Sequence, residues 1–417
     1  MKKKKPSLSR LPFIAFIFLI LVLGSLFFYQ QKNSRRSEKI VQTASFTSGR
    51  IAFVHNYNIW VARPNGNAEA LTHDAENNKT ETSSLVLGYS HPLWAPDGKK
   101  LVFSFSQFRP NGPIDKTFFL SDGKSFISPW NPSGVISMPR WIDSDSASVI
   151  SFGKYDLNTG FGIAKIITRK FQGNEELDTN YDPNSYKFVG WEGCGGGGRP
   201  AWSGVLSANH GGGMEGIRNT FIYLKDEKKL IYSSGCEQET VYVSTGESES
   251  RLFDPSHPGE SGIDFTIRKT PQEFVLSPDG SMLAGTFARN IVLYSLDGKL
   301  IRLLTTNARA FGPVFSPDGK SIYYADNVGE KVTLKRVSVE GGSLQTLYTS
   351  PYTGAISNIN FSPNGKEILF TRIDQVTPQT EEGADPGEAK QSLYLINADG
   401  NNPRLFLVDA SQGSWGE

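Results

Sequence analysis

The sequence predicts an all-β protein, a seven-bladed β-propeller behind one N-terminal transmembrane helix, with six or eight blades as alternatives. Two observations lead to this prediction. Four segments repeat nearly the same pattern, and a long uncharged apolar run lies close to the N-terminus. The repeats bear most strongly on the fold, because repeated structural units bury their apolar faces against the neighbouring units.

Each repeat predicts a strand, a tight turn and a second strand. The copies span residues 91–105, 273–287, 312–326 and 358–372. In the segment Ser316-Pro317-Asp318-Gly319, proline presets φ for the second turn position, and Asp318 suits the third because its side chain can accept nearby backbone N–H groups. Gly319 permits positive φ at the exit, and the flanking apolar residues alternate with the period of half-buried strands.

A second pair of strands follows the first in each unit. Residues 293–303 and 337–344 predict a hairpin with an Asp-Gly or a Gly-Gly turn. Four strands per unit, a to d, make one blade of a propeller.

The repeats resemble the TolB-like, WD-repeat-like β-propeller family, whose hallmark is a Trp/Phe-Ser-Pro-Asp-Gly box. The box lies at residues 94–98, 276–280, 315–319 and 361–365, and Ala95 and Asn364 depart from it. The resemblance covers the chain from about residue 49 to the end. Members of this family bind, scaffold or catalyse, so the resemblance implies the fold without a single function.

The N-terminus predicts a membrane anchor. Residues 1–10 form a basic tail, and residues 11–29 form an uncharged run of roughly 28 Å as a helix, about one hydrocarbon core. The alternative, a cleaved signal peptide, requires a small-residue cleavage site, and Leu23-Gly24-Ser25 is a poor one. Basic residues before the run slightly outnumber those after it, which predicts a cytoplasmic N-terminus and an exterior C-terminal domain in a cell membrane.

Two further segments follow the anchor. Residues 30–48 are polar and predict a linker, and residues 49–417 predict a bacterial-type, extracytoplasmic propeller domain. The first blade has strand patterns near Ile51, Ile59 and Ala70, with an Asn65-Gly66 turn and no box. We therefore predict that the C-terminal segment 410–415 supplies its missing first strand, which would bring Trp415 into the sheet of Trp60 and remove an exposed edge.

The remaining blades follow from the boxes. We expect blade two to begin near Pro92 with a c–d turn at residues 121–124, and blade three near Met138, where residues 140–145 resemble a decayed box. Blade four is expected at residues 186–253. The last three blades begin near Glu273, Gly312 and Ile359.

The connections b–c and d–a share one face of a propeller, and the sequence predicts that they are long. Binding residues concentrate in long loops on a rigid scaffold. The expected loops are residues 72–90, 107–116, 153–160, 207–219, 254–262 and 373–391. The candidate binding residues on this face are His55, His91, His210, His257, Arg109 and Asp374.

Histidines bear on a possible metal. Together with His73, the four histidines above are all those in the chain, and imidazoles gathered over a channel suit a transition metal. No His-x-x-x-His or Cys-x-x-Cys spacing supports such a site, so scattered solvated histidines are the simpler interpretation. We therefore expect no cofactor, and a divalent metal remains the alternative.

The only two cysteines, Cys194 and Cys236, predict a disulfide in an exterior compartment. The bond would close a loop of about 43 residues and stabilise the fold by ~4 kcal/mol in the chain-entropy model. Two unpaired thiols are the alternative.

Composition narrows the function classes. The formal net charge is +1, so electrostatics implies no nucleic-acid partner. We expect a non-catalytic module that binds an envelope protein, peptide or glycan through the long-loop face. The alternative is a metal-dependent lyase or hydrolase at the channel mouth, and a structural spacer is the third reading.

Overall fold

The described residues all belong to one unit of the chain, Gln42–Glu417. The computed structural model describes residues 46–64, 67–80, 83–108, 115–124, 126–130, 135–136, 139–156, 161–172, 175–179, 186–188, 221–224, 227, 229–234, 240–244, 249–251, 274–287, 289–306, 308–326, 331–351, 353–374 and 390–417. The expected anchor at residues 11–29 and the expected Asn65-Gly66 turn lie outside these ranges. Within them, no helix is long and apolar enough to cross a membrane.

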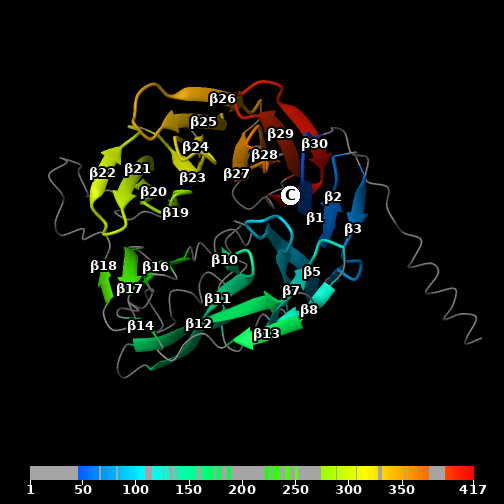
Figure 1. Ribbon diagram of the computed structural model, residues 1–417. Helices are drawn as coiled ribbons and strands as arrows, with labels where there is room; N and C mark the ends of the chain where they lie inside the picture. Colours follow the sequence, from blue (N-terminus) through cyan, green and yellow to red (C-terminus); the bar gives the residue numbers. More distant parts are fainter. Residues whose placement is uncertain are drawn as a thin grey trace, which may run out of the picture. The chain divides into compact units, whose positions relative to one another are not determined.

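The described residues are all-β, as the sequence predicts. They contain no helix, and their strands form seven antiparallel sheets, numbered here in chain order (Figure 1). Sheets 1 and 2 take the first strands of the chain. Sheet 1 contains β1 (Arg50–His55), β2 (Asn58–Ala62), β3 (Ala68–Ala70) and β31 (Ala410–Gly416); sheet 2 contains β4 (Glu76–Thr80), β5 (Ser83–Trp94), β6 (Leu101–Phe108), β7 (Asp115–Ser121) and β8 (Phe126–Trp130).

Sheets 3 and 4 come from the middle of the chain. Sheet 3 contains β9 (Val135–Ile136), β10 (Arg140–Asp143), β11 (Ser146–Asp156), β12 (Phe161–Gln172), β13 (Glu175–Thr179) and β14 (Tyr186–Phe188); sheet 4 contains β15 (Phe221–Leu224), β16 (Lys229–Ser234), β17 (Thr240–Ser244) and β18 (Glu249–Arg251). Blade three was therefore placed correctly. The prediction that blade four begins at Tyr186 was wrong, because β14 pairs with β12 of sheet 3.

Sheets 5, 6 and 7 repeat one four-stranded meander. Sheet 5 contains β19 (Phe274–Leu276), β20 (Met282–Phe287), β21 (Asn290–Ser295) and β22 (Leu300–Leu303); sheet 6 contains β23 (Ala310–Phe315), β24 (Ser321–Asp326), β25 (Thr333–Ser338) and β26 (Gln345–Thr349); sheet 7 contains β27 (Gly354–Phe361), β28 (Glu367–Asp374), β29 (Lys390–Asn397) and β30 (Arg404–Val408). Sheets 5 and 6 begin within two residues of the predicted positions, whereas sheet 7 begins five residues before Ile359, because β27 pairs with β28 from Gly354 onward.

The box forms the expected turn. In sheet 6 the Gly319 N–H donates to the Ser316 carbonyl at 2.9 Å, and Gly319 has φ +69°. The Ser316 hydroxyl donates to Asp318 at 2.6 Å and accepts the Ser321 N–H at 3.0 Å. Asp318 also accepts the Lys320 N–H at 3.1 Å, so one Ser–Asp pair satisfies the backbone of the whole turn.

A β-bulge recurs in β5, β23, β27 and β31, each of which is the first strand of a pair whose second strand is β6, β24, β28 or β1 respectively. It inserts one extra residue, always with positive φ and always three positions before the box aromatic. The bulge residues are His91, Gly312, Asn358 and Gln412. Each lies opposite an aromatic residue of the second strand with 0% exposure, and these are Phe103, Tyr324, Phe370 and Phe53 respectively. The extra residue thus bends the first strand at the ring that fills the middle of the sheet.

Neighbouring sheets pack through alternating apolar side chains. One cluster joins sheets 6 and 7 through residues such as Leu334 and Ile368, and another joins sheets 5 and 6 through Leu293 and Ile322. Sheets 1 and 2 share a third cluster that contains Trp94. The core is therefore divided into inter-sheet layers, which lets a long chain fold without one large core.

Sheet 1 closes as the sequence predicts. The C-terminal strand β31 pairs antiparallel with β1, with Trp415 opposite Ile51, in the sheet that contains Trp60. The first strand of this sheet therefore comes from the opposite end of the sequence to the other three, and β1 has no exposed edge on that side.

Candidate binding face

The connections expected to be long loops are partly strands. β4 and the beginning of β5 occupy much of residues 72–90, and β11 and β12 extend to within four residues of each other around residues 153–160. The prediction of irregular loops there was wrong, because strand pairing continues beyond the box repeats. The expected loops at residues 207–219 and 254–262 lie outside the described ranges.

His55 ends β1 and is fixed on both sides of its ring. Its Nδ1 lies 2.8 Å from the Asp409 carbonyl, and the Asn56 amide nitrogen lies 3.1 Å from its Nε2. Because an amide nitrogen only donates, we assign the proton to Nδ1 and the acceptor role to Nε2. The ring also meets Trp60 edge to face at 5.9 Å. His55 therefore ties the β30–β31 connection to the β1–β2 turn.

His91 is a bulge residue, and its backbone joins two sheets. Its N–H donates to the Gln412 side-chain carbonyl at 2.7 Å, which connects β5 to the bulge of β31. On the other side of β31, Asn360 donates to the Gly413 carbonyl at 2.8 Å and to the Asn358 carbonyl at 2.7 Å. The strands β27, β31 and β5, of sheets 7, 1 and 2, are thus linked by side-chain amides.

We call Asn358, Asn360, Gln412 and His91 the polar arc. Asn358 is exposed, and the other three are partly buried. The backbone N–H of Trp94 donates to the Ser414 hydroxyl at 3.2 Å, which adds a second bond between sheets 2 and 1. The indole N–H of Trp141 donates to the Leu93 carbonyl at 2.9 Å and so connects sheet 3 to sheet 2. The arc offers amide and imidazole groups, the kinds of donor and acceptor that hydrogen-bond peptides and sugars.

Asp374, predicted as a binding residue, lies in an ion pair at the end of β28. One oxygen lies 2.6 Å from an Arg372 guanidinium nitrogen, and both side chains are largely buried. Arg372 also donates to the Tyr348 hydroxyl at 3.0 Å and lies 4.3 Å from the Tyr394 ring centroid. Asp374 therefore neutralises a cation packed between sheets 6 and 7.

The other predicted site residues are not brought together by the described structure. His73 is exposed, and Arg109, His210, His257, Cys194 and Cys236 lie outside the described ranges. Among the residues that are described, no three or more His, Cys, Asp or Glu side chains lie close enough to hold a metal.

An Asn–Thr clamp on the same face was not indicated by any motif. In sheet 1 the Thr72 hydroxyl accepts the Ile59 N–H at 2.9 Å and donates to Asn58 at 2.9 Å. Sheet 5 repeats it, with Thr305 accepting the Ile291 N–H at 2.8 Å. In both sheets the dipeptide Asn-Ile begins one strand and the dipeptide Leu-Thr follows the next strand. This recurrence in the sequence could have revealed the clamp.

A second contact fixes the connection between sheets 1 and 2. The Tyr89 hydroxyl donates to Asp74 at 2.9 Å. Burial, this hydrogen bond and the nearby charge of Asp74 all raise the pKa of Tyr89, which keeps the hydroxyl neutral and donating.

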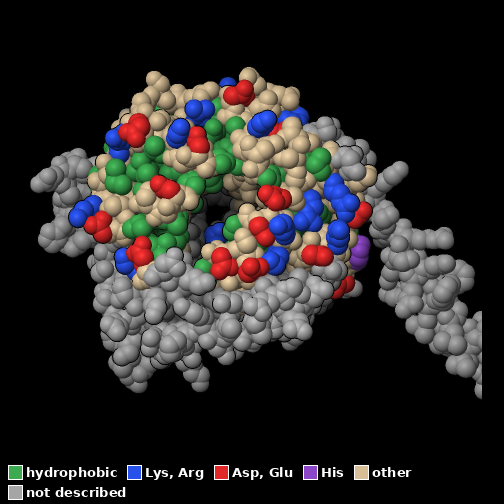
Figure 2. Space-filling view, viewed as in Figure 1, with side chains coloured by type: hydrophobic (Ala, Val, Ile, Leu, Met, Phe, Trp, Pro, Cys, Tyr) green, Lys and Arg blue, Asp and Glu red, His purple; other side chains and the backbone are tan. Residues whose placement is uncertain are grey.

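Over the face in Figure 2, acidic and basic side chains lie next to one another without a large patch of one sign.

Comparisons with known proteins find relatives that match part of the chain. No protein-family model matches the chain. It is 29% identical over 144 residues to an uncharacterized protein of Agrobacterium fabrum (strain C58), covering 33% of this chain and 47% of that protein. It is 25% identical over 196 residues to a tricorn protease homolog of Saccharolobus solfataricus, covering 44% of this chain and 16% of that protein. The aligned part thus spans less than half the length of either relative.

Among solved structures, TolB from Acinetobacter baumannii is similar, with a TM-score of 0.41 and 14% identity over 89% of this chain and 81% of that one. TolB and other β-propeller proteins are the structural neighbours, in agreement with the resemblance of the repeats.

Proposed function

We propose that the chain is a seven-bladed β-propeller that binds an envelope protein, peptide or glycan without catalysis. The observation that carries the proposal is the polar arc. Its side chains come from three neighbouring sheets, hydrogen bonds join those sheets at the arc, and Asn358 is exposed. Groups that are already held in place lose little freedom on binding, which favours affinity.

The arc's chemistry favours recognition of a neutral polar ligand. Asn358 and Gln412 contribute uncharged amide donors and acceptors, and the bulges place them and His91 at equivalent positions on their strands. The side-chain amides of Asn358, Asn360 and Gln412 are uncharged, so we expect binding with weak salt dependence.

Site-specific photo-crosslinking of the full-length chain in its native membrane tests this proposal. A photoreactive amino acid replaces Asn358 in one variant and Glu340 in the control. Glu340 is exposed in the β25–β26 turn of sheet 6, whereas Asn358 lies in the middle of β27 in sheet 7. We expect one discrete adduct at position 358 and none at 340.

The adduct's chemistry identifies the ligand class. Sensitivity to protease indicates a protein or peptide, and resistance to protease with sensitivity to glycosidase indicates a glycan. Equal labelling at both positions, or no adduct at position 358, contradicts a binding role for the arc.

We further propose that residues 11–29 hold the propeller to the cell membrane with residues 49–417 outside. The uncharged run behind a basic tail supports this. The full-length chain should remain with membranes after an alkaline carbonate wash, and protease added to intact cells should digest the propeller. Release by carbonate, or protection in intact cells, contradicts this arrangement.

A further inference from the structure

In sheet 1 the paired strands β31 and β1 have no turn between them. A box joins β5 to β6, β19 to β20, β23 to β24 and β27 to β28, but in sheet 1 β31 and β1 come from opposite ends of the sequence. Residues Phe46–Arg50 lie at the place where the box would be. We call this segment the strap, and the pairing of β1 with β31 the seam.

The strap is packed onto β31. The Trp415 indole N–H donates to the Ser48 carbonyl at 2.9 Å, and the Phe46 ring meets Trp415 edge to face at 5.5 Å. Phe46 is 5% exposed, although the sequence assigned it to the linker. Arg50 donates to the Glu417 carbonyl at 2.9 Å, so the strap holds the end of the seam at which Arg50 pairs with Gly416.

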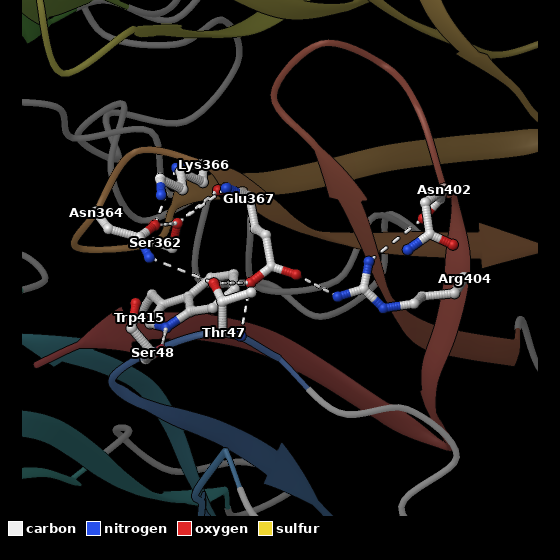
Figure 3. A network of polar contacts seen from close by, with 9 residues as sticks. All are labelled: Thr47, Ser48, Ser362, Asn364, Lys366, Glu367, Asn402, Arg404 and Trp415. Atoms are coloured by element: carbon white, nitrogen blue, oxygen red, sulfur yellow. Dashed lines mark hydrogen bonds and ion pairs between the residues drawn. The ribbon is translucent and has the colours of Figure 1, made fainter.

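Glu367 holds the strap to sheet 7 (Figure 3). The Thr47 N–H donates to one carboxylate oxygen at 2.8 Å, and the Thr47 hydroxyl donates to the same oxygen. The other oxygen pairs with Arg404 of β30. Asn364 donates to the Thr47 hydroxyl at 3.3 Å, so the box turn of sheet 7 also supports the strap.

The repeat shows that Glu367 is specific to this place. Six residues after the box aromatic, the other copies have Lys100, Met282 and Ser321. Glu367 is the only carboxylate at this position in the four repeats, and it is 2% exposed. A buried carboxylate is costly unless it is paired and hydrogen-bonded, which its contacts with Thr47 and Arg404 provide.

The same position makes a related contact between sheets 2 and 3. Lys100 lies 2.5 Å from Asp145 and 3.2 Å from the Ser144 carbonyl, in the turn between β10 and β11. There the chain itself connects β10 to β11, and Lys100 only adds a side-chain contact to that turn. At the seam the chain is not continuous, so Glu367 and the strap replace the turn.

Ionisation of Glu367 matches this role. Burial alone would raise the pKa of Glu367, but the hydrogen bonds from Thr47 and the pairing with Arg404 outweigh it and lower the pKa below the usual glutamate value. The charged group that faces the carboxylate from the packed elements is Arg404, whereas Thr47 and Asn364 are neutral. The stabilisation is therefore present above about pH 4.3 and is lost as the pH falls through the lower folded-state value.

We propose that the strap closes the seam in place of a covalent turn, and that it stays closed only while Glu367 is ionised. When the carboxyl group gains a proton, Arg404 loses its counter-charge and Thr47 loses an anionic acceptor. The strap then detaches and β1 separates from β31 locally, while the sheets away from the seam remain folded.

Hydrogen exchange of the full-length chain tests the proposal. Glu367→Gln keeps the shape of the side chain and removes its charge. At pH 7 we expect the amides of β1 and β31 to lose protection by at least about tenfold, and those of β24 and β25 to change by less than about twofold. Thr47→Val, which removes only the hydroxyl, should give a smaller loss in the same strands.

Lys100→Met is the matched control, because it removes a contact at the same repeat position beside a covalent turn. We expect it to leave the protection of β1 and β31 unchanged. Unchanged protection of the seam in Glu367→Gln, or an equal loss in β24 and β25, overturns the proposal. An equal loss at the seam in Lys100→Met also overturns it.

Acid provides the second measurement. After correction for intrinsic exchange, wild-type seam amides should lose protection when the pH falls from 7 to about 3, relative to those of β24, whereas Glu367→Gln should show little further change. The same acid dependence in both proteins contradicts the role of Glu367. Neither outcome depends on ligand binding, so the result is independent of the proposed function.

Discussion

Sheets 1 and 6 contain the same four-stranded pattern, but their first two strands are joined in different ways. In sheet 6, four consecutive residues and one Ser–Asp pair fix the register. In sheet 1, the register of β31 and β1 depends on Trp415, the strap and Glu367. The comparison shows that side chains far apart in sequence can fix the register of two strands that no turn connects. Several buried contacts are needed for this.

Removing the indole of Trp415 should have the largest effect. Trp415→Ala deletes a side chain that is 8% exposed and its hydrogen bond to Ser48, so we expect a loss of about 3–5 kcal/mol in the free energy of unfolding by urea. Phe315→Ala, at the same repeat position in sheet 6, should cost a similar amount. Only Trp415→Ala should increase hydrogen exchange in β1 at low urea; equal exchange in both variants would refute a separate seam.

A methyl group on the strap should have the next largest effect. Gly49 has φ +81°, and a Cβ there would lie 2.1 Å from the Gly416 carbonyl oxygen. We expect Gly49→Ala to cost about 2–4 kcal/mol, from backbone strain and the clash together.

The control for that substitution is Gly280→Ala. Gly280 has φ +72° in the box of sheet 5, and its Cβ would meet nothing within 4 Å, so the cost should be about 1–2 kcal/mol. Similar unfolding midpoints for the two variants would show that the close approach to β31 is unimportant.

Removing or adding the box serine should change the free energy of unfolding by a smaller amount, downward when it is removed and upward when it is added. Ser316→Ala removes the acceptor of the Ser321 N–H and should cost about 1 kcal/mol. Sheet 2 has Ala95 at this position, so Ala95→Ser should add the missing bonds and gain up to about 1 kcal/mol. Urea midpoints measure both, and a loss of stability in Ala95→Ser would contradict the shared geometry.

The smallest effect concerns an exposed turn carboxylate. The hydrogen bond from Ser295, followed by that from Lys299, lowers the pKa of Asp297 to about 2. Ser295→Ala should therefore raise it toward the ordinary value, as followed by NMR titration. Because the folded-state pKa is lowered, the turn contact stabilises above the ordinary aspartate value and is lost as the pH falls toward 2. An unshifted carboxylate in the wild type would contradict the turn geometry.

The sequence predicts the covalent turns better than the contacts of the strap. The box, the start of each repeat and the pairing of residues 410–415 with β1 were visible because proline, glycine and period-two alternation are local signals. Residues 46–48 of the strap were assigned to the linker, since Phe46 and Thr47 acquire partners only when residues 317 or more positions away fold beside them.

The candidate site was predicted only in part, for a related reason. His91 belongs to the polar arc, but Asn358, Asn360 and Gln412 carry no motif, because a bulge is defined by the register between strands. Asp374 and His55 were selected by residue type, and the structure shows that both have partners within the chain. Residue type alone does not distinguish a binding group from one that holds a connection.

The pairing of β1 with β31 has a consequence for biosynthesis. Arg50 and Glu417 are separated by 367 positions, so at typical translation rates β1 waits about 20–70 s for its partner strand to be made. During that time the backbone N–H and C=O groups on one side of β1 are open to pairing with any extended peptide. Unpaired strand edges promote aggregation, so β1 is exposed to this risk until β31 has been made.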